Sequence, residues 1–165
     1  MIRPASVDEL FAIAIAMEDL SQEFYLALAP ACDNREVSRL CRVLAGQEAQ
    51  HRQLFETMRH FAAGAPSTLA APGAPLDMET LEDVIHHQVL PLPEDVRKVA
   101  LEGGLSNALD LAIRLEEDAI AFYGRIARVM PALGDEIDAL VHAERDHLRQ
   151  LRDAKHRLSD SSLRA

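Results

Sequence analysis

Four long stretches of this chain place apolar residues at alternating spacings of three and four, the pattern of a helix with one buried face. This pattern leaves little room for β-strands, and the richness in Ala, Leu and Glu favours helices as well. The sequence therefore predicts an all-α protein. The predicted helices cover residues 6–29, 34–63, 106–130 and 135–158.

Residues that start and stop helices bound these stretches. Ser6 forms a capping box with Glu9, and Asp33 stands before the second stretch with Glu36 three residues on. Proline and glycine are expected to end the helices, because proline lacks the backbone donor and glycine favours helix ends. These residues are Pro30, Gly64, Pro66 and Pro131.

The lengths of the connections predict how the helices are arranged. About four residues join the first helix to the second, and about four join the third to the fourth, so each pair forms an antiparallel hairpin. The hairpins cover residues 6–63 and 105–158, and residues 64–104 form a long crossover between them. We expect a single domain over residues 1–165, folded as a ferritin-like four-helix bundle.

The crossover has a character of its own. Residues 64–76 are rich in Pro, Gly and Ala without a period, and short helices are expected over 77–90 and from Pro93 to Gly103. His86 and His87 fall on the first of these. Adjacent residues of a helix point about 100° apart, so a surface location is favoured over joint metal binding.

Charge and composition exclude some classes of function. The formal net charge of -10 argues against nucleic acid as a partner, because phosphate binding needs a basic surface. No apolar run is long enough to span a bilayer, so no membrane partner is expected. The N-terminal stretch is interpreted as the first helix and not as a signal peptide, and the expected location is cytoplasmic. The spacing of Cys32 and Cys41 fits no zinc site.

An internal repeat links the two predicted hairpins. The segment AIAMEDLSQEFY at 14–25 aligns with AIRLEEDAIAFY at 112–123, and LAGQEAQH at 44–51 aligns with LVHAERDH at 140–147. Each hairpin therefore carries Glu-x6-Tyr on its first helix and Glu-x-x-His on its second. A single Glu-x-x-His pair is expected by chance in a chain of this composition, but two pairs at matched positions are not.

The repeated polar residues interrupt the apolar face of each helix near its middle. Six of them are predicted to meet in one layer of the bundle core: Glu18, Glu48, His51, Glu116, Glu144 and His147. Burying four carboxylates together costs several kcal/mol for each charge, and like charges repel. Two divalent cations would neutralise them, and carboxylate with imidazole suits iron or manganese.

Simpler interpretations stay open for single residues. One Glu on such a face is usually at its solvated edge, and one His is usually a structural residue. Tyr25 and Tyr123 either hydrogen-bond the carboxylates of a metal site or fill the core with their hydroxyl groups satisfied. A metal-free structural bundle also remains an alternative for the whole chain. Three further histidines lie out of phase with the predicted site: His60, His142 and His156.

With these residues the chain resembles the rubrerythrin-like, diiron-carboxylate members of the ferritin-like superfamily. The resemblance covers both hairpins and implies two bound iron ions, with manganese or zinc as other possible occupants. It implies that Glu18 and His51 bind one iron, that Glu116 and His147 bind the other, and that two carboxylates bridge them. The bridging residues are Glu48 and Glu144.

Some positions depart from the rubrerythrin pattern. Rubrerythrins carry Glu where this chain has Ile113, and Glu where it has His147, so the ligand set is closer to that of bacterioferritins. The chain has no Cys-x-x-Cys pair, so no rubredoxin domain is expected. The resemblance implies a homodimeric non-haem diiron oxidoreductase that reacts with O2 or H2O2 and takes electrons from a separate donor. The alternative is a metal-binding or iron-handling protein without catalytic turnover.

Overall fold

The computed structural model describes residues 6–64 and 93–162, and the regular structure in these two ranges is helical. The predicted all-α fold is therefore confirmed. The predicted linker from residue 65 on and the predicted helix 77–90, with His86 and His87, lie outside the described residues. The described helices are α1 (Val7–Ala31), α2 (Arg35–Gly64), α4 (Pro93–Glu102), α5 (Leu105–Val129), η2 (Pro131–Leu133) and α6 (Gly134–Ser162).

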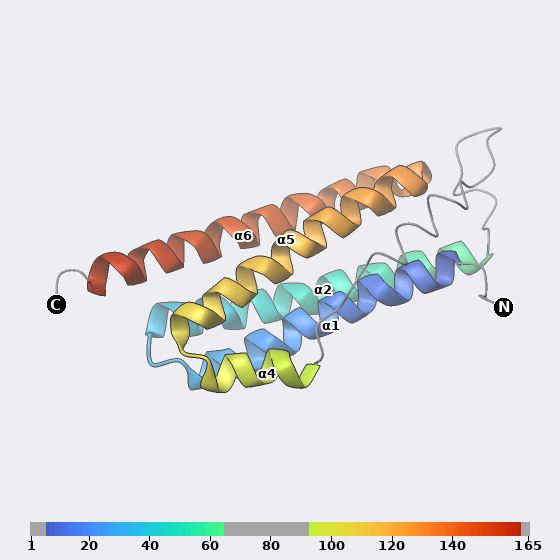
Figure 1. Ribbon diagram of the computed structural model, residues 1–165. Coiled ribbons are helices and arrows are strands. Elements are labelled where there is room, and N and C mark those ends of the chain that lie inside the picture. Colours follow the sequence, from blue (N-terminus) through green and yellow to red (C-terminus); the bar gives the residue numbers. More distant parts are fainter. Residues whose placement is uncertain (1–5, 65–92, 163–165) are drawn as a thin grey trace.

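The four long helices pack as two hairpins. Helices α1 and α2 lie side by side over most of their length, and so do α5 and α6 (Figure 1). The second hairpin lies against the first through contacts of α1 with α5 and of α2 with α6. Helix α4 packs against α1 and the beginning of α5. The predicted four-helix bundle of two hairpins agrees with this packing.

Most predicted helix starts are found within a residue or two. The Ser6 hydroxyl accepts a hydrogen bond from the backbone N–H of Glu9 at 3.2 Å, as the capping box requires. The prediction for α2 was wrong by one residue, because the cap is Asn34 and not Asp33. The Asn34 side-chain oxygen accepts from the backbone N–H groups of Glu36 and Val37, at 3.0 and 3.1 Å.

The predicted end of the first helix is also corrected. Pro30 lies inside α1, which continues to Ala31. A proline in the last turn removes only one backbone hydrogen bond, and few later residues depend on it. The nearby carbonyl of Ala29 has a partner of its own, since the Ser38 hydroxyl donates to it at 2.5 Å. This bond joins the end of α1 to the first turn of α2.

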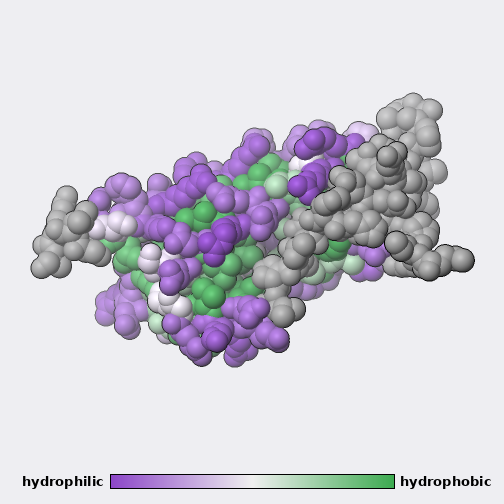
Figure 2. Space-filling view, viewed as in Figure 1, coloured by the Kyte–Doolittle hydropathy of each residue, from purple (hydrophilic) through white to green (hydrophobic). Residues whose placement is uncertain are grey.

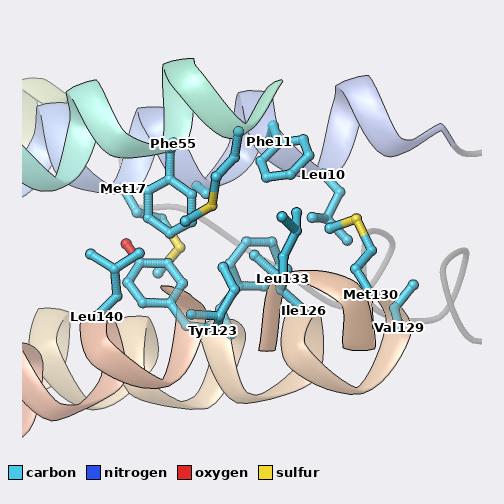
Figure 3. Close-up of a cluster of buried hydrophobic side chains, with 14 of the residues drawn as sticks. Leu10, Phe11, Met17, Phe55, Tyr123, Ile126, Val129, Met130, Leu133 and Leu140 are labelled. Carbon is cyan, nitrogen blue, oxygen red and sulfur yellow. The ribbon is translucent and has the colours of Figure 1, made fainter. Parts of the chain in front are cut away.

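The apolar core is divided into two clusters by a layer of polar residues. The first apolar cluster lies towards the α5–α6 connection, where side chains of α1 and α2 point towards those of the second hairpin (Figure 3). Its members include Leu10, Phe11, Phe55, Phe122, Ile126 and Leu140. The second apolar cluster lies towards the α1–α2 connection and α4. Its members include Phe24, Leu28, Leu44, Val96, Leu109 and Leu151.

On the face shown in Figure 2, hydrophilic residues surround an area of apolar residues in the middle of the described part. Within residues 6–64 and 93–162, four large apolar residues are more than half exposed: Leu26, Val43, Phe61 and Leu101. Among the helices that the structure describes, none is both long and apolar enough to cross a membrane.

Candidate metal centre

The structure brings the six predicted ligand residues together in the layer between the two apolar clusters, which we call the polar layer. Helix α1 supplies one of them, α2 two, α5 one and α6 two. Five are at most 2% exposed, whereas His51 is 12% exposed. The six residues are Glu18, Glu48, His51, Glu116, Glu144 and His147.

Two carboxylates lie between the two histidines. The oxygens of Glu144 lie 2.8 Å from Nδ1 of His51 and 2.8 Å from Nδ1 of His147, one oxygen to each ring. Glu48 has the same arrangement, with one oxygen 3.4 Å from His51 and the other 3.1 Å from His147. Each of these carboxylates thus faces both histidines at once. Such a position is the one that a bridging ligand needs.

The other two carboxylates each approach one histidine only. A Glu18 oxygen lies 3.7 Å from Nδ1 of His51, and a Glu116 oxygen lies 3.7 Å from Nδ1 of His147. The imidazole rings of His51 and His147 stack with their centroids 5.4 Å apart. The layer is therefore close to two-fold symmetric, with a Glu and a His at each side and two shared carboxylates between them.

The unpaired atoms of this layer point to a cation. Nδ1 of both histidines, both oxygens of Glu144 and one oxygen of Glu48 are buried without an aligned hydrogen bond, despite the short separations. One donor atom from each of these four residues lies within 4.8 Å of the others. Buried polar atoms normally have partners, and a metal ion between them would satisfy all of these together. Glu and His are ligands that divalent transition metals accept, so the residues fit a metal.

Each tyrosine of the repeat joins the two hairpins. The Tyr25 hydroxyl on α1 donates a hydrogen bond to Glu116 on α5, and the Tyr123 hydroxyl on α5 donates to Glu18 on α1. Both rings are fully buried. Burial raises the pKa of both phenols well above its usual value, and the carboxylate partners add to the rise. The tyrosines therefore keep their protons and remain donors.

The ionisation of the carboxylates differs between the centre and the edges of the layer. Burial raises the pKa of Glu18 and Glu116 well above the usual range, and the charge of Glu48 adds to this. Burial also opposes ionisation of Glu144, but contacts with the two histidines outweigh it and lower the pKa of Glu144 to about 2. The pKa of Glu48 is lowered for the same reason.

The histidines hold their protons when no metal is bound. Burial favours the neutral imidazoles, but the carboxylates outweigh it and raise the pKa of His51 to about 9 and that of His147 to about 12. For His51 the carboxylates responsible are Glu144 and Glu48. A metal must displace these protons, because it binds the neutral imidazole. Protons and metal therefore compete for the same Nδ1 atoms.

The structure also places the residues that the pattern left outside the site. His60, His142 and His156 are exposed, in agreement with their phase on the helices. Cys32 and Cys41 are both free thiols. The sequence analysis did not predict a role for Gln47, whose side-chain oxygen is buried without a partner. Nε2 of His147 is also buried without a partner. The only sequence feature that marks Gln47 is its alignment with Ala143 in the repeat.

No family model matches the chain, and neither the curated proteins nor the solved structures that were compared with it include a match. The interpretation of the polar layer therefore depends on its own geometry. That geometry is a buried carboxylate and histidine cluster that can hold metal.

Proposed function

We propose that this protein is a diiron oxidoreductase of the ferritin-like superfamily, related to the rubrerythrins, that reduces O2 or H2O2 with electrons from a separate donor. The observation that carries the proposal is the pair of shared carboxylates, since each of Glu48 and Glu144 faces both histidines. One cation would need no such symmetry. Two cations side by side need bridging anions between them.

The distances support a role for each residue. Glu18 and His51 would hold one iron, and Glu116 and His147 would hold the other, because each outer carboxylate approaches only its own histidine. Four carboxylates and two neutral imidazoles balance two divalent ions, so the filled layer carries no net charge. This removes the electrostatic cost of burying four carboxylates.

Bound as a pair, iron supplies two electrons together, which is what reduction of H2O2 to two water molecules requires along with two protons. The chain's own part is to hold and to shield. Tyr25 and Tyr123 fix the orientation of the outer carboxylates by donating to one oxygen of each. The apolar clusters on both sides exclude bulk water from the layer, which strengthens the electrostatic interactions inside it.

The test is a metal titration of the purified chain, followed by exposure to oxidant. After anaerobic addition of Fe(II), we expect two iron ions per chain by elemental analysis, and oxidation of both ions by O2 or H2O2 in stopped-flow absorption. Glu48→Ala should lose bound iron, because it removes a ligand of both ions. Glu56→Ala is the matched control on the same helix, since Glu56 is exposed and pairs with Arg52 on the surface.

The possible results separate the hypotheses. Absence of stoichiometric metal, or full binding by Glu48→Ala, would contradict the metal centre itself. Two bound ions that no oxidant changes would support the alternative, a metal-binding or iron-handling protein without turnover. Fast oxidation followed by reduction with an added donor would support the enzyme.

A further inference from the structure

The two halves of the polar layer are not equally closed. His51 is 12% exposed, whereas its counterpart His147 is 1% exposed. The repeat aligns these histidines and also the glutamates three residues before them. The residue directly before each glutamate differs, however: it is Gln47 in the first hairpin and Ala143 in the second. A long polar side chain thus stands where its counterpart has only a methyl group.

Gln47 is half-buried, and its place on α2 indicates that its side chain points towards α6. Helices α2 and α6 contact each other, and the residue after Gln47, Glu48, has an oxygen 3.1 Å from Nδ1 of His147. On α2, Val43 precedes Gln47 by one turn and lines the groove between α2 and α6, opposite Gln150. Gln47 therefore projects from the side of α2 that faces α6, at the level of the His147 ring.

The unpaired atoms on the two sides match each other. Nδ1 of His147 faces the carboxylates, so the ring carries its other hydrogen on Nε2, which is a donor. This Nε2 is buried without a partner, and the side-chain oxygen of Gln47, an acceptor, is buried without a partner as well. An unsatisfied buried polar atom costs about 1–3 kcal/mol, so pairing the two removes both penalties.

We propose that Gln47 is a positioning residue that accepts a hydrogen bond from Nε2 of His147 and closes that half of the centre, whereas Ala143 leaves the His51 half open as the route for metal ions and small oxidants. The proposal rests on the proposed metal centre for its ligands. The difference between Gln47 and Ala143, however, is present in the chain whether or not metal is bound. Hydrogen-bonded partners behind a metal-binding histidine fix its ring orientation and its tautomer.

The test is the exchange of the histidine Nε2 hydrogens with water, followed by NMR on the full chain labelled with ¹⁵N-histidine, both metal-free and loaded with Zn(II). We expect the His147 Nε2 hydrogen to exchange slowly and that of His51 to exchange fast, in both forms. Gln47→Ala should speed the exchange at His147 by about tenfold or more, the change that corresponds to loss of one hydrogen bond. Gln50→Ala, an exposed glutamine on the same helix, is the matched control.

A second variant tests the open half. Ala143→Gln should protect the His51 hydrogen and slow the uptake of Co(II), followed by absorption, without changing the final number of ions. Ala139→Gln, an exposed alanine one turn earlier on α6, controls for the added side chain. Equal exchange of the two histidines in the unaltered chain, or unchanged exchange in Gln47→Ala, would overturn the role of Gln47. Unchanged Co(II) uptake in Ala143→Gln would overturn the proposed route.

The outcome does not depend on iron chemistry. If the metal-free chain shows the expected difference but no ion binds, the proposed metal centre is wrong and the pairing of Gln47 with His147 stands. If Zn(II) binds but the Nε2 hydrogens of the two histidines exchange at the same rate, the metal centre stands and the pairing of Gln47 with His147 is wrong.

Discussion

The polar layer and the apolar clusters on either side of it are formed by the same four helices, yet they contribute to the fold in opposite ways. In the first apolar cluster, Phe11 and Ile126 stabilise the fold simply by leaving water. In the polar layer, Glu18 and Glu116 are just as buried, and burial works against their charge. The comparison indicates that the clusters supply stability and the layer consumes part of it unless a cation is bound.

Removing a buried ring from an apolar cluster should have the largest effect. Phe11→Ala leaves a cavity at a fully buried position and should lower the free energy of unfolding by about 3–5 kcal/mol, measured by urea denaturation. The loss should be similar with and without metal, because Phe11 lies outside the polar layer. Phe61→Ala, at a position 53% exposed, is the control and should change stability by about 0.5 kcal/mol or less. A comparable loss in both variants would contradict the assignment of the core.

The metal-free layer should make stability depend on pH. The pKa of His51 is about 9 in the folded chain and about 6.5 when unfolded, so the folded state holds this proton more tightly. The resulting stability is fully present below about pH 6.5 and is lost as the pH rises through about 9, a change of about 3 kcal/mol.

Urea denaturation of the metal-free chain between pH 6 and 10 measures this loss. His51→Gln should make the loss smaller but not abolish it, because the pKa of His147 is raised as well, to about 12. The exposed His142→Gln should leave the profile unchanged. Metal-loaded protein should show little of this dependence, because its histidines are already neutral. A profile that rises towards pH 9 in the metal-free chain would contradict the sign.

Bound metal should raise the free energy of unfolding through the residues of the polar layer and independently of the apolar clusters. An ion present at 100 times its dissociation constant adds about 2.7 kcal/mol, because it binds only the folded chain. Glu144→Ala should lose this increment, since Glu144 faces both histidines. Thermal unfolding with and without Zn(II) measures the difference. Phe11→Ala should keep the full increment, and its loss there would mean that layer and clusters are coupled.

Removing the tyrosine hydrogen bonds that join the two hairpins should have the smallest effect on stability. Tyr25→Phe removes the hydrogen bond to Glu116 and should cost about 1 kcal/mol in the metal-free chain. Tyr123→Phe removes the equivalent bond to Glu18 and should cost a similar amount. Urea denaturation of both variants checks this. Strongly unequal losses would mean that the symmetry of the layer does not extend to its energetics.

The sequence predicted the fold and the composition of the polar layer because both depend on helical spacing. Two residues three positions apart on a helix, such as Glu48 and His51, lie on the same face. The matching pair in the second hairpin indicated that this face belongs to a shared site. The ends of two helices were predicted less accurately, because they are set by local features near the α1–α2 connection. Asn34 caps α2 by accepting two hydrogen bonds, and α1 continues past Pro30. A helix end depends on a few residues, whereas the buried face is marked by a pattern that extends along the whole helix.

The partners across the bundle could not be predicted in the same way. That Tyr25 reaches Glu116, on the other hairpin, follows only from which helices are neighbours and how they are rotated. The same holds for Gln47, whose surroundings are set by α6. Spacing along one helix contains no information about the helix opposite.

The two tyrosine bonds also bear on the order of folding. Each hairpin closes through contacts between neighbouring stretches of the chain, which form quickly. The bonds of Tyr25 and Tyr123 join residues 91 and 105 positions apart, so the loops that they close are long. Such contacts cost more entropy to form and are expected to come last. We therefore expect the polar layer to be assembled in the final docking step, so that uptake of metal by a folding chain would report when the two hairpins meet.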